Sequence, residues 1–340
     1  MKFASLRCLT LAASLTFGLT AFSQQLTWST DQYDPNTTDV GGQSTRPGVA
    51  SAVFNNKIWI AYLKSTTCNG NLCDVVVKNN GGNGLSFGNE QYLYPQQTSG
   101  PLTANANPTL AVSNGFLYMA YTGAPNNNYI ISSSDGVNWS APYQIAVGLS
   151  TWYSPVMAVD PNTNPNALWI TLMSGSTKTP ILCEVLPNTS NISYSSQDCQ
   201  NLTGLDTVSY NPGIAVHNGI IYLGFANGSN GCLYFYQLNA TSWYSSFWNP
   251  LPSCQATNAA PSLAVHNGYL YAAFRTGGNA NTFTVAISPD FQSMPYIEKP
   301  GFGMGGPGDL LPLDNSQTGN PDFLLNFYVY SNRLYYTYGQ

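Results

Sequence analysis

The side chains best suited to ligand chemistry in this 340-residue chain are amides, aromatic rings and a few cations that flank recurring apolar segments. Aromatic rings cover the C–H faces of a sugar, and amides pair with its hydroxyl groups. The set therefore predicts binding of a sugar or another polyhydroxylated ligand. Its members are Arg46, Lys64, Asn107, Trp152, Tyr153, Tyr210, Asn211, Asn258 and Arg275, with Asn126, Asn127 and Asn227 as further candidates.

Carboxylates offer a second kind of chemistry. Two acids about 5 to 10 Å apart suffice for glycoside hydrolysis, and the candidates are Asp39, Asp206 and Asp309. The sequence does not show whether two of them converge, so a glycoside hydrolase is an alternative to a binding protein. No nucleophile-elbow, Walker, HExxH or dinucleotide motif occurs, and we predict neither a cofactor nor a metal site. His217 and His266 lie apart from the cysteine pairs and are interpreted as turn residues.

A repeated phrase indicates which elements position these residues. Residues 107–115, 211–219 and 260–268 share the pattern Pro-x-x-Ala-Val-x-Asn-Gly, and looser copies follow Pro47 and Pro155. A sixth copy would begin at Pro307 or Pro312. Repetition at about 50 residues is typical of propellers and solenoids.

Each copy has the pattern of a short antiparallel sheet. In the fifth copy we expect strands at 262–265, 269–274, 282–288 and 295–298, with Asn267-Gly268 as the first hairpin turn. Four antiparallel strands at this period describe a propeller blade. The sequence thus predicts an all-β, six-bladed propeller of four-stranded antiparallel blades, with five blades as the alternative.

Composition agrees with a turn-rich all-β chain, since it has 31 Gly, 22 Pro, 13% aromatic and only 7% charged residues. No linker divides residues 24–340, so we expect one propeller domain. Its last copy ends one strand short after residues 322–330 and 333–338. We predict that an N-terminal strand at 26–33 completes that blade and removes the exposed sheet edge.

The first 23 residues have the features of a secretory signal peptide: Lys2 and Arg7, an apolar stretch at 9–19, and a small-residue cleavage site near Ser23. The mature chain is therefore expected to be secreted or periplasmic. Six cysteines remain after cleavage, and they fall as neighbours in the sequence. In an oxidising compartment we predict three bridges, each inside one blade: Cys68 with Cys73, Cys183 with Cys199, and Cys232 with Cys254.

The net charge of −5 and the pI near 4.7 argue against nucleic acid or an anionic membrane surface as a partner. No membrane-inserted segment remains beyond the signal, and we expect a monomer with a carbohydrate or glycoconjugate ligand. A protein-interaction scaffold is a further alternative, favoured by a flat apolar central face.

Residues 133–139, Ser-Ser-Asp-Gly-Val-Asn-Trp, resemble the Asp-box of sialidase-like propellers, with one residue fewer between Asp and Gly. Together with the repeated phrase, the resemblance covers most of the mature chain. It implies a structural role for Ser133, Asp135, Gly136 and Trp139, which close the turn between the third and fourth strands of a blade. It also implies that ligand binds on the central face, where the first strand begins and the second ends.

Sialidase chemistry, by the same resemblance, needs three arginines around a carboxylate, a Tyr activated by Glu, and an acid Asp. The mature chain has only Arg46, Arg275 and Arg333, and Arg333 lies in a turn or at a strand start. The glutamates in or near third and fourth strands, toward the blade exterior, are Glu90, Glu184 and Glu298. We therefore predict a lectin-like propeller without a recognisable sialidase catalytic set.

Overall fold

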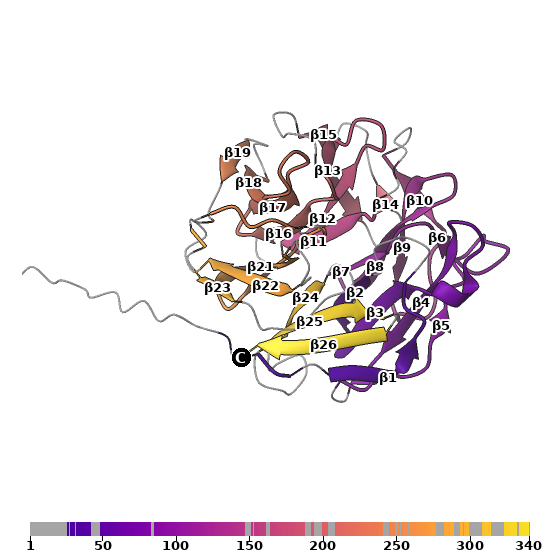
Figure 1. The fold of residues 1–340 in the computed structure, drawn as a ribbon. Coiled ribbons are helices and arrows are strands. Elements are labelled where there is room, and N and C mark those ends of the chain that lie inside the picture. The colour runs from indigo at the N-terminus through magenta and orange to yellow at the C-terminus, as the bar shows by residue number, and fades with distance from the viewer. Residues whose placement is uncertain are drawn as a thin grey trace, which may run out of the picture.

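The computed structural model describes residues 26, 28–30, 32–41, 48–82, 85–146, 151, 153–160, 164–187, 192–193, 199–202, 208–240, 245–248, 251, 253–257, 259–276, 282–288, 293–294, 296–298, 308–313, 323–331 and 333–339. These residues form six antiparallel sheets arranged around a common centre (Figure 1). The predicted six-bladed propeller is confirmed, and the five-bladed alternative is wrong. The proposed signal peptide at 1–23 lies outside the described residues.

The blades follow one another along the chain. Blade 1 contains β2 (Val49–Phe54), β3 (Lys57–Leu63), β4 (Cys73–Asn79) and β5 (Gln91–Tyr92), with β6 (Thr103–Ala104) also paired to β4. Blade 2 contains β7 (Thr109–Ser113), β8 (Phe116–Gly123), β9 (Asn127–Ser133) and β10 (Tyr143–Ile145). Blade 3 contains β11 (Val156–Asp160), β12 (Asn164–Met173), β13 (Pro180–Pro187) and β14 (Ile192–Ser193), with β15 (Cys199–Asn201) also paired to β13.

The second half of the ring repeats the pattern. Blade 4 contains β16 (Gly213–His217), β17 (Ile220–Ala226), β18 (Leu233–Asn239) and β19 (Ser245–Trp248). Blade 5 contains β20 (Ser262–His266), β21 (Tyr269–Arg275), β22 (Phe283–Ser288) and β23 (Tyr296–Glu298), within two residues of the predicted bounds. Blade 6 contains β24 (Asp309–Leu313), β25 (Phe323–Tyr330), β26 (Arg333–Gly339) and, from the other end of the chain, β1 (Gln32–Thr38).

The turn between the first two strands of a blade explains why the phrase repeats. Both turn residues have positive φ, as in Asn114 (50°) with Gly115 (73°) and Asn267 (49°) with Gly268 (76°). This is the type I′ geometry that matches the right-handed twist of a hairpin, and Asn-Gly adopts it readily. A short apolar strand followed by Asn-Gly therefore produces the same inner hairpin in blades 2, 4 and 5.

The first strand of each blade lies nearest to the centre and contacts its counterparts in the neighbouring blades (Figure 1). Side-chain hydroxyls connect these strands across the gaps between blades. The backbone N–H of Met157 donates to Thr109 Oγ1 at 3.3 Å, and that of Leu310 donates to Ser262 Oγ at 3.0 Å. Such bonds fix the radial position of each blade.

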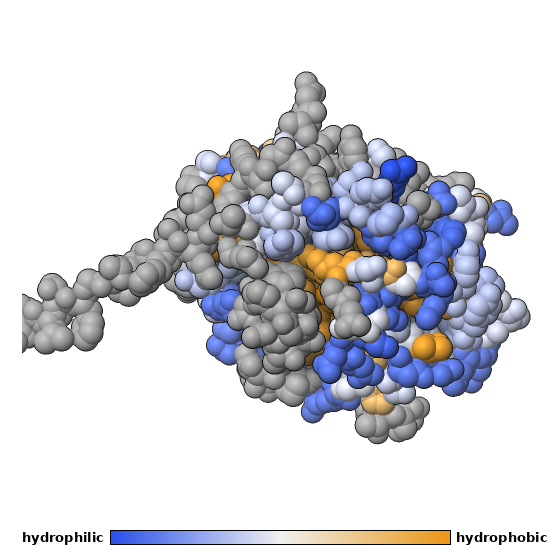
Figure 2. Space-filling view, turned by 90° about the horizontal axis from the view of Figure 1, so that it is seen from below, coloured by the Kyte–Doolittle hydropathy of each residue, from blue (hydrophilic) through white to orange (hydrophobic). Residues whose placement is uncertain are grey.

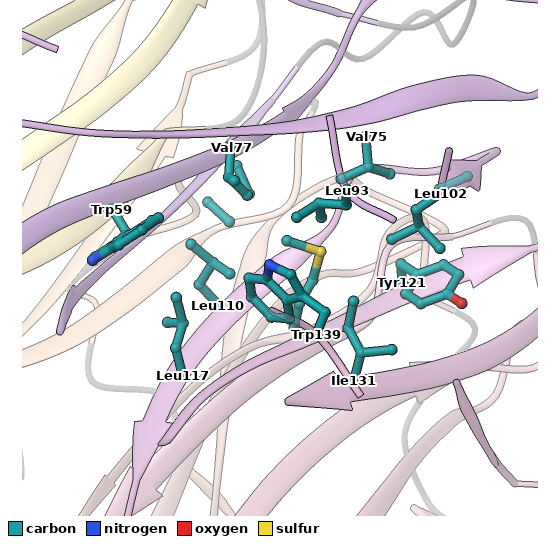
Figure 3. Close-up of a cluster of buried hydrophobic side chains, with 14 of the residues drawn as sticks. Trp59, Val75, Val77, Leu93, Leu102, Leu110, Leu117, Tyr121, Ile131 and Trp139 are labelled. Atoms are coloured by element: carbon teal, nitrogen blue, oxygen red, sulfur yellow. The ribbon is translucent and has the colours of Figure 1, made fainter. Parts of the chain in front are cut away.

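Apolar side chains between adjacent blades form the cores of the molecule. Between blades 1 and 2, Figure 3 shows Trp59, Leu110 and Trp139 packed with aliphatic residues from both sheets. Fully burying one large apolar side chain contributes about 1.5–3 kcal/mol. The blades are thus held together mainly by these inter-sheet cores.

Turn 133–139 carries the residues that resemble an Asp-box. Asp135 Oδ1 accepts hydrogen bonds from the backbone N–H groups of Val137 and Asn138, both at 2.7 Å, and Gly136 N donates to Ser133 Oγ at 2.8 Å. The hydrogen bonds from Asn138 and Val137 hold the pKa of the Asp135 carboxyl well below its usual range. Trp139, at the end of the turn, is buried in the core of Figure 3. The Asp135 carboxylate therefore stabilises the turn by accepting these backbone hydrogen bonds.

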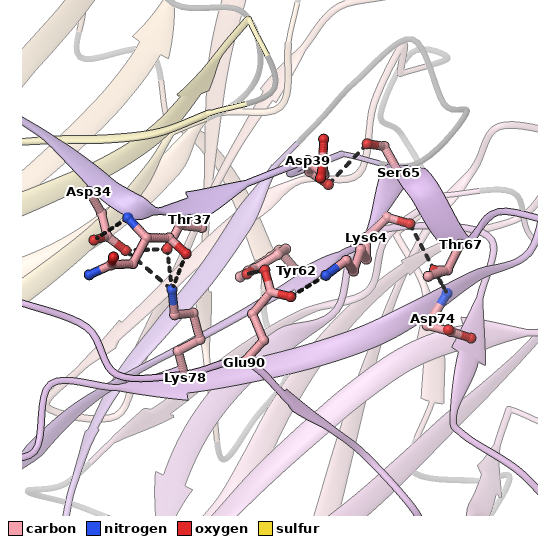
Figure 4. Close-up of polar contacts among 11 residues, drawn as sticks. Asp34, Thr37, Asp39, Tyr62, Lys64, Ser65, Thr67, Asp74, Lys78 and Glu90 are labelled. Carbon is pink, nitrogen blue, oxygen red and sulfur yellow. Dashed lines mark hydrogen bonds and ion pairs between the residues drawn. The ribbon is translucent and has the colours of Figure 1, made fainter.

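The ring closes where β1 pairs antiparallel with β26. The strand spans Gln32–Thr38 and not the predicted residues 26–33, and Trp28 forms a separate bridge with Gly339. β1 also reaches blade 1, because Lys78 Nζ donates to Asn36 O at 2.8 Å and to Thr37 Oγ1 at 2.7 Å and lies 3.4 Å from Asp34 Oδ2 (Figure 4). We call these contacts the outer clasp.

Three disulfides lie in the predicted pairs, each inside one blade: Cys68–Cys73, Cys183–Cys199 and Cys232–Cys254. Such bridges fit an extracellular protein. In the part of the chain that the structure describes, no helix has the length and apolar character needed to span a membrane. The side of the molecule in Figure 2 has hydrophilic residues over much of its described surface, with apolar ones in a narrow band and isolated spots.

Candidate ligand-binding site

A cavity of about 150 Å³ lies at the centre of the ring, where the inner strands of all six blades begin. Each blade contributes residues from the start of its first strand or from the segment just before it. One lining residue from each, in chain order, is Val49, Thr109, Val156, Asn211, Ser262 and Asp309. Because the strands start at the same end of the ring, their preceding segments meet around one hollow. We call it the central cavity.

Four of the nine predicted ligand-binding residues line this cavity: Asn107, Tyr153, Tyr210 and Asn211. Each of them directly precedes, or lies within three residues of, an inner strand. Lys64 directly follows the second strand of blade 1, and Arg275 is the last residue of the second strand of blade 5; neither is among the lining residues. Arg46, Trp152 and Asn258 lie outside the described residues.

Lys64 belongs to a different polar group, on blade 1 (Figure 4). Its ammonium pairs with Glu90 and lies 5.6 Å from the centre of the Tyr92 ring. Glu90 Oε1 also accepts a 2.7 Å hydrogen bond from Tyr62 OH. Burial is the main cause that raises the pKa of Tyr62 far above its usual value, and the hydrogen bond to Glu90 raises it further. The Tyr62 hydroxyl therefore stays protonated at neutral pH and is a weaker nucleophile than a phenolate. This Tyr–Glu pair does not line the central cavity.

Two amides in the cavity wall have unused acceptors. Asn211 is buried, and its Nδ2 donates to the carbonyl oxygen of Ser154, while Oδ1 has no hydrogen-bond partner among the described residues. Asn105 donates to Asn126 Oδ1 at 2.5 Å, and its own Oδ1 is likewise without a partner there. A buried acceptor left unpaired costs about 1–3 kcal/mol. Asn105 was not among the residues predicted from the sequence, although its amide between Ala104 and Ala106, shortly before an inner strand, could have indicated a place in the site.

Asp309, the first residue of β24, brings a carboxyl group to the cavity wall. Its Oδ2 accepts from Ser51 N and from Ser51 Oγ, both at 2.5 Å, which joins blade 6 to blade 1. Burial raises the pKa of Asp309 to about 7, against the lowering effect of the two bonds from Ser51. The residue keeps part of its surface exposed. Near neutral pH its carboxyl is therefore divided between the neutral and ionised forms.

The other carboxylates singled out from the sequence do not join it. Asp39 is not a lining residue, and its carbonyl oxygen accepts from Ser65, while Asp206 lies outside the described residues. Among the described lining residues, the ionisable side chains are Tyr153, Tyr210 and Asp309. The described wall of the cavity is thus neutral apart from one weak acid.

Replacing Asp309 with Asn should remove a pH dependence from stability. The carboxyl titrates near 4 in the unfolded chain but near 7 when folded, so the folded form binds the proton more tightly. Wild-type stability should therefore fall relative to Asp309→Asn as pH rises from 5 to 8, by about 2 kcal/mol, since partial exposure reduces the full linkage value. Guanidinium unfolding of both proteins at several pH values measures the difference. A pH-independent difference would contradict it.

No family model and no curated protein sequence matches this chain. Solved structures do, at low sequence identity. The Penicillium chrysogenum alpha-L-arabinanase complexed with arabinobiose has a TM-score of 0.61 and 13% identity, with 92% of this chain and 98% of that chain covered. The Hadza microbial sialidase Hz136 has a TM-score of 0.59 and 11% identity, covering 87% and 68%. Such likeness establishes a sialidase-like propeller fold.

Longer proteins also share the fold. The Trypanosoma rangeli sialidase in complex with the inhibitor DANA has a TM-score of 0.55 and 10% identity. The match covers 91% of this chain but only 59% of that sialidase. This chain therefore corresponds to only part of the length of that sialidase.

Proposed function

We propose that this protein is an exported, lectin-like propeller that binds a carbohydrate in its central cavity. The observation that carries the proposal is the convergence of Asn107, Asn211, Tyr153 and Tyr210 on one hollow at the start of the inner strands. Amide groups can pair with sugar hydroxyls while phenol rings cover C–H faces. The Oδ1 atoms of Asn105 and Asn211, which have no hydrogen-bond partner among the described residues, add acceptors at the wall.

The chemistry of the wall supports a neutral saccharide over an anionic one. Its described part contains no Lys or Arg, and Asp309 would repel a ligand carboxylate when ionised. A propeller of the same fold has been solved with the neutral sugar arabinobiose, which is in keeping with this assignment. A protein-interaction scaffold fits less well, because it would favour a flat face, whereas this site is a concave hollow that combines apolar residues with amides and phenols.

Hydrolysis of a glycoside is a second candidate function, and the raised pKa of Asp309 is the observation that favours it. A carboxyl that titrates near 7 can donate a proton to a leaving group at neutral pH. The reaction needs a second carboxylate about 5 to 10 Å away. The described lining residues provide none, so binding without turnover is the primary proposal.

A glycan-array screen of the mature, oxidised protein, followed by calorimetry on the hits, tests the binding proposal. Tyr210→Ala should raise Kd by about tenfold, because truncating a central aromatic contact has an effect of that order. Tyr143→Ala is a matched control, since Tyr143 is also partly buried but lies on β10 at the outer edge of blade 2. Equal Kd values for Tyr210→Ala and wild type would contradict the proposal.

Incubating each array hit with the protein separates the two candidate functions. Under the binding proposal the glycan is recovered intact, with wild type and with Asp309→Asn alike. Release of a reducing end by wild type, abolished in Asp309→Asn, would instead establish a hydrolase that uses Asp309 as its acid.

A further inference from the structure

A second hollow, away from the centre, lies where the outer strand of blade 1 meets turn 133–139 of blade 2. It has a volume of about 320 Å³, and we call it the outer groove, defined by Gln91, Tyr92, Tyr94, Gln96, Val137 and Asn138. The backbone N–H of Gln96 donates to Trp139 O at 3.1 Å, so the two sides are fastened together. The outer groove shares no lining residue with the central cavity.

Large apolar side chains are exposed here to an unusual degree. Tyr94 is 65% exposed, Val137 60% and Tyr92 37%, and the other large apolar residues exposed in the described chain are Tyr33 and Leu186. Between the two tyrosines, Leu93 is buried in the core between blades 1 and 2, whereas Tyr92 and Tyr94 on either side of it are exposed. The ammonium of Lys64, 5.6 Å from the Tyr92 ring centre, helps to hold that ring in place.

The other exposed lining residues of the outer groove are polar and uncharged. Gln91, Gln96 and Asn138 supply amides, and Asn138 Nδ2 is directed to Asp135 Oδ2 at 2.7 Å. Two phenol rings between amides, without a charged lining residue, match the C–H faces and hydroxyls of an uncharged sugar chain. A protein-docking surface is usually a larger continuous apolar patch. Here the exposed apolar side chains are two tyrosines and one valine, and the other apolar lining residues, Leu93 and Trp139, are buried.

We propose that the outer groove binds a segment of a neutral polysaccharide, as a second carbohydrate site independent of the central cavity. Tyr94 is its main contact, since it is the most exposed ring. Tyr92 and the flanking amides define the direction of the chain. The assignment does not depend on what occupies the central cavity, and each site can be tested without the other.

Native gels containing soluble linear arabinan, xylan or glucomannan test the proposal, with anionic polygalacturonate as the charge control. At least one neutral polysaccharide should retard the wild-type protein. Tyr94→Ala should raise the apparent Kd by about tenfold, and Tyr92→Ala/Tyr94→Ala should abolish retardation. Tyr33→Ala is the matched control, because Tyr33 is 50% exposed on β1 and lines neither hollow.

Three results would overturn the proposal. The first is that no neutral polysaccharide retards the wild-type protein. The second is retardation of Tyr94→Ala equal to that of wild type. The third is loss of retardation in Tyr210→Ala but not in Tyr94→Ala, which would assign the binding to the central cavity. Unchanged melting temperatures of the variants show that folding is intact, as expected for exposed positions.

Discussion

Replacing Asp34 with Ala is expected to lower the free energy of unfolding by about 3–5 kcal/mol. The reason lies in the outer clasp, where Lys78 is 0% exposed and Asp34 is its charged partner. Without that carboxylate, the ammonium keeps hydrogen bonds to Asn36 O and Thr37 Oγ1 but has no ion-pair partner among the described residues. Chemical unfolding of the oxidised protein, followed by tryptophan fluorescence, measures the loss.

Two further variants show whether the charge itself is responsible. Asp34→Ala/Lys78→Met removes both charges and should recover part of the lost stability, because an apolar side chain is tolerated where a lone buried cation is not. Lys64→Met is the matched control, since it breaks the part-exposed pair with Glu90 and should cost less than about 1 kcal/mol. If Asp34→Ala unfolds within 1 kcal/mol of wild type, the outer clasp does not hold the ring in this way.

Gly136→Ala is expected to destabilise the protein by about 3 kcal/mol, the second largest effect. Gly136 has a φ of +79°, and a Cβ at that position would lie 2.3 Å from atoms of the Trp59 ring. Trp59 is buried in the core between blades 1 and 2, and its Nε1 donates to Phe54 O at 3.2 Å. A shift of the ring would therefore break this hydrogen bond and disturb the packing of the core. The added methyl group would therefore push the two blades apart.

Gly115→Ala is a matched control for the backbone contribution. Gly115 has a similar φ of +73°, but a Cβ there would meet nothing within 4 Å. Gly115→Ala should lower the free energy of unfolding by about 1 kcal/mol. The additional destabilisation in Gly136→Ala then measures the clash with Trp59. The excess should shrink in a Trp59→Leu background, which leaves room for the methyl group. Equal losses for the two glycines would show that backbone strain alone is responsible.

Position within the repeat determined how well the site could be predicted. Residues just before an inner strand, such as Asn107 and Asn211, line the central cavity because every inner strand begins there. Lys64 and Arg275, by contrast, lie at or just beyond the end of a second strand, which is one strand farther from the centre. The sequence showed which end of the ring they occupy but not their distance from its axis. For that reason the predicted set was too large.

Contacts between blades were the other part that the repeat could not predict. Lys78 and Asp34 are 44 residues apart and lie in different sheets, and neither belongs to the repeated phrase. The closing strand was predicted at 26–33 because the last copy ends one strand short, and a missing strand does not define which residues pair or in what register. The disulfides were easier, because each pair lies inside one blade and close in the sequence.

The pairing of β1 with β26 also sets an order of events during synthesis. β1 is made among the first strands, but the strand that receives it is the last of the ring. Until residues 333–339 have been synthesised, blades 1 to 5 can form only an open arc that lacks the pairing of β1 with β26. The nascent chain therefore lacks the pairing of β1 with β26 for most of its synthesis. A chaperone that binds the incomplete ring would act during that interval.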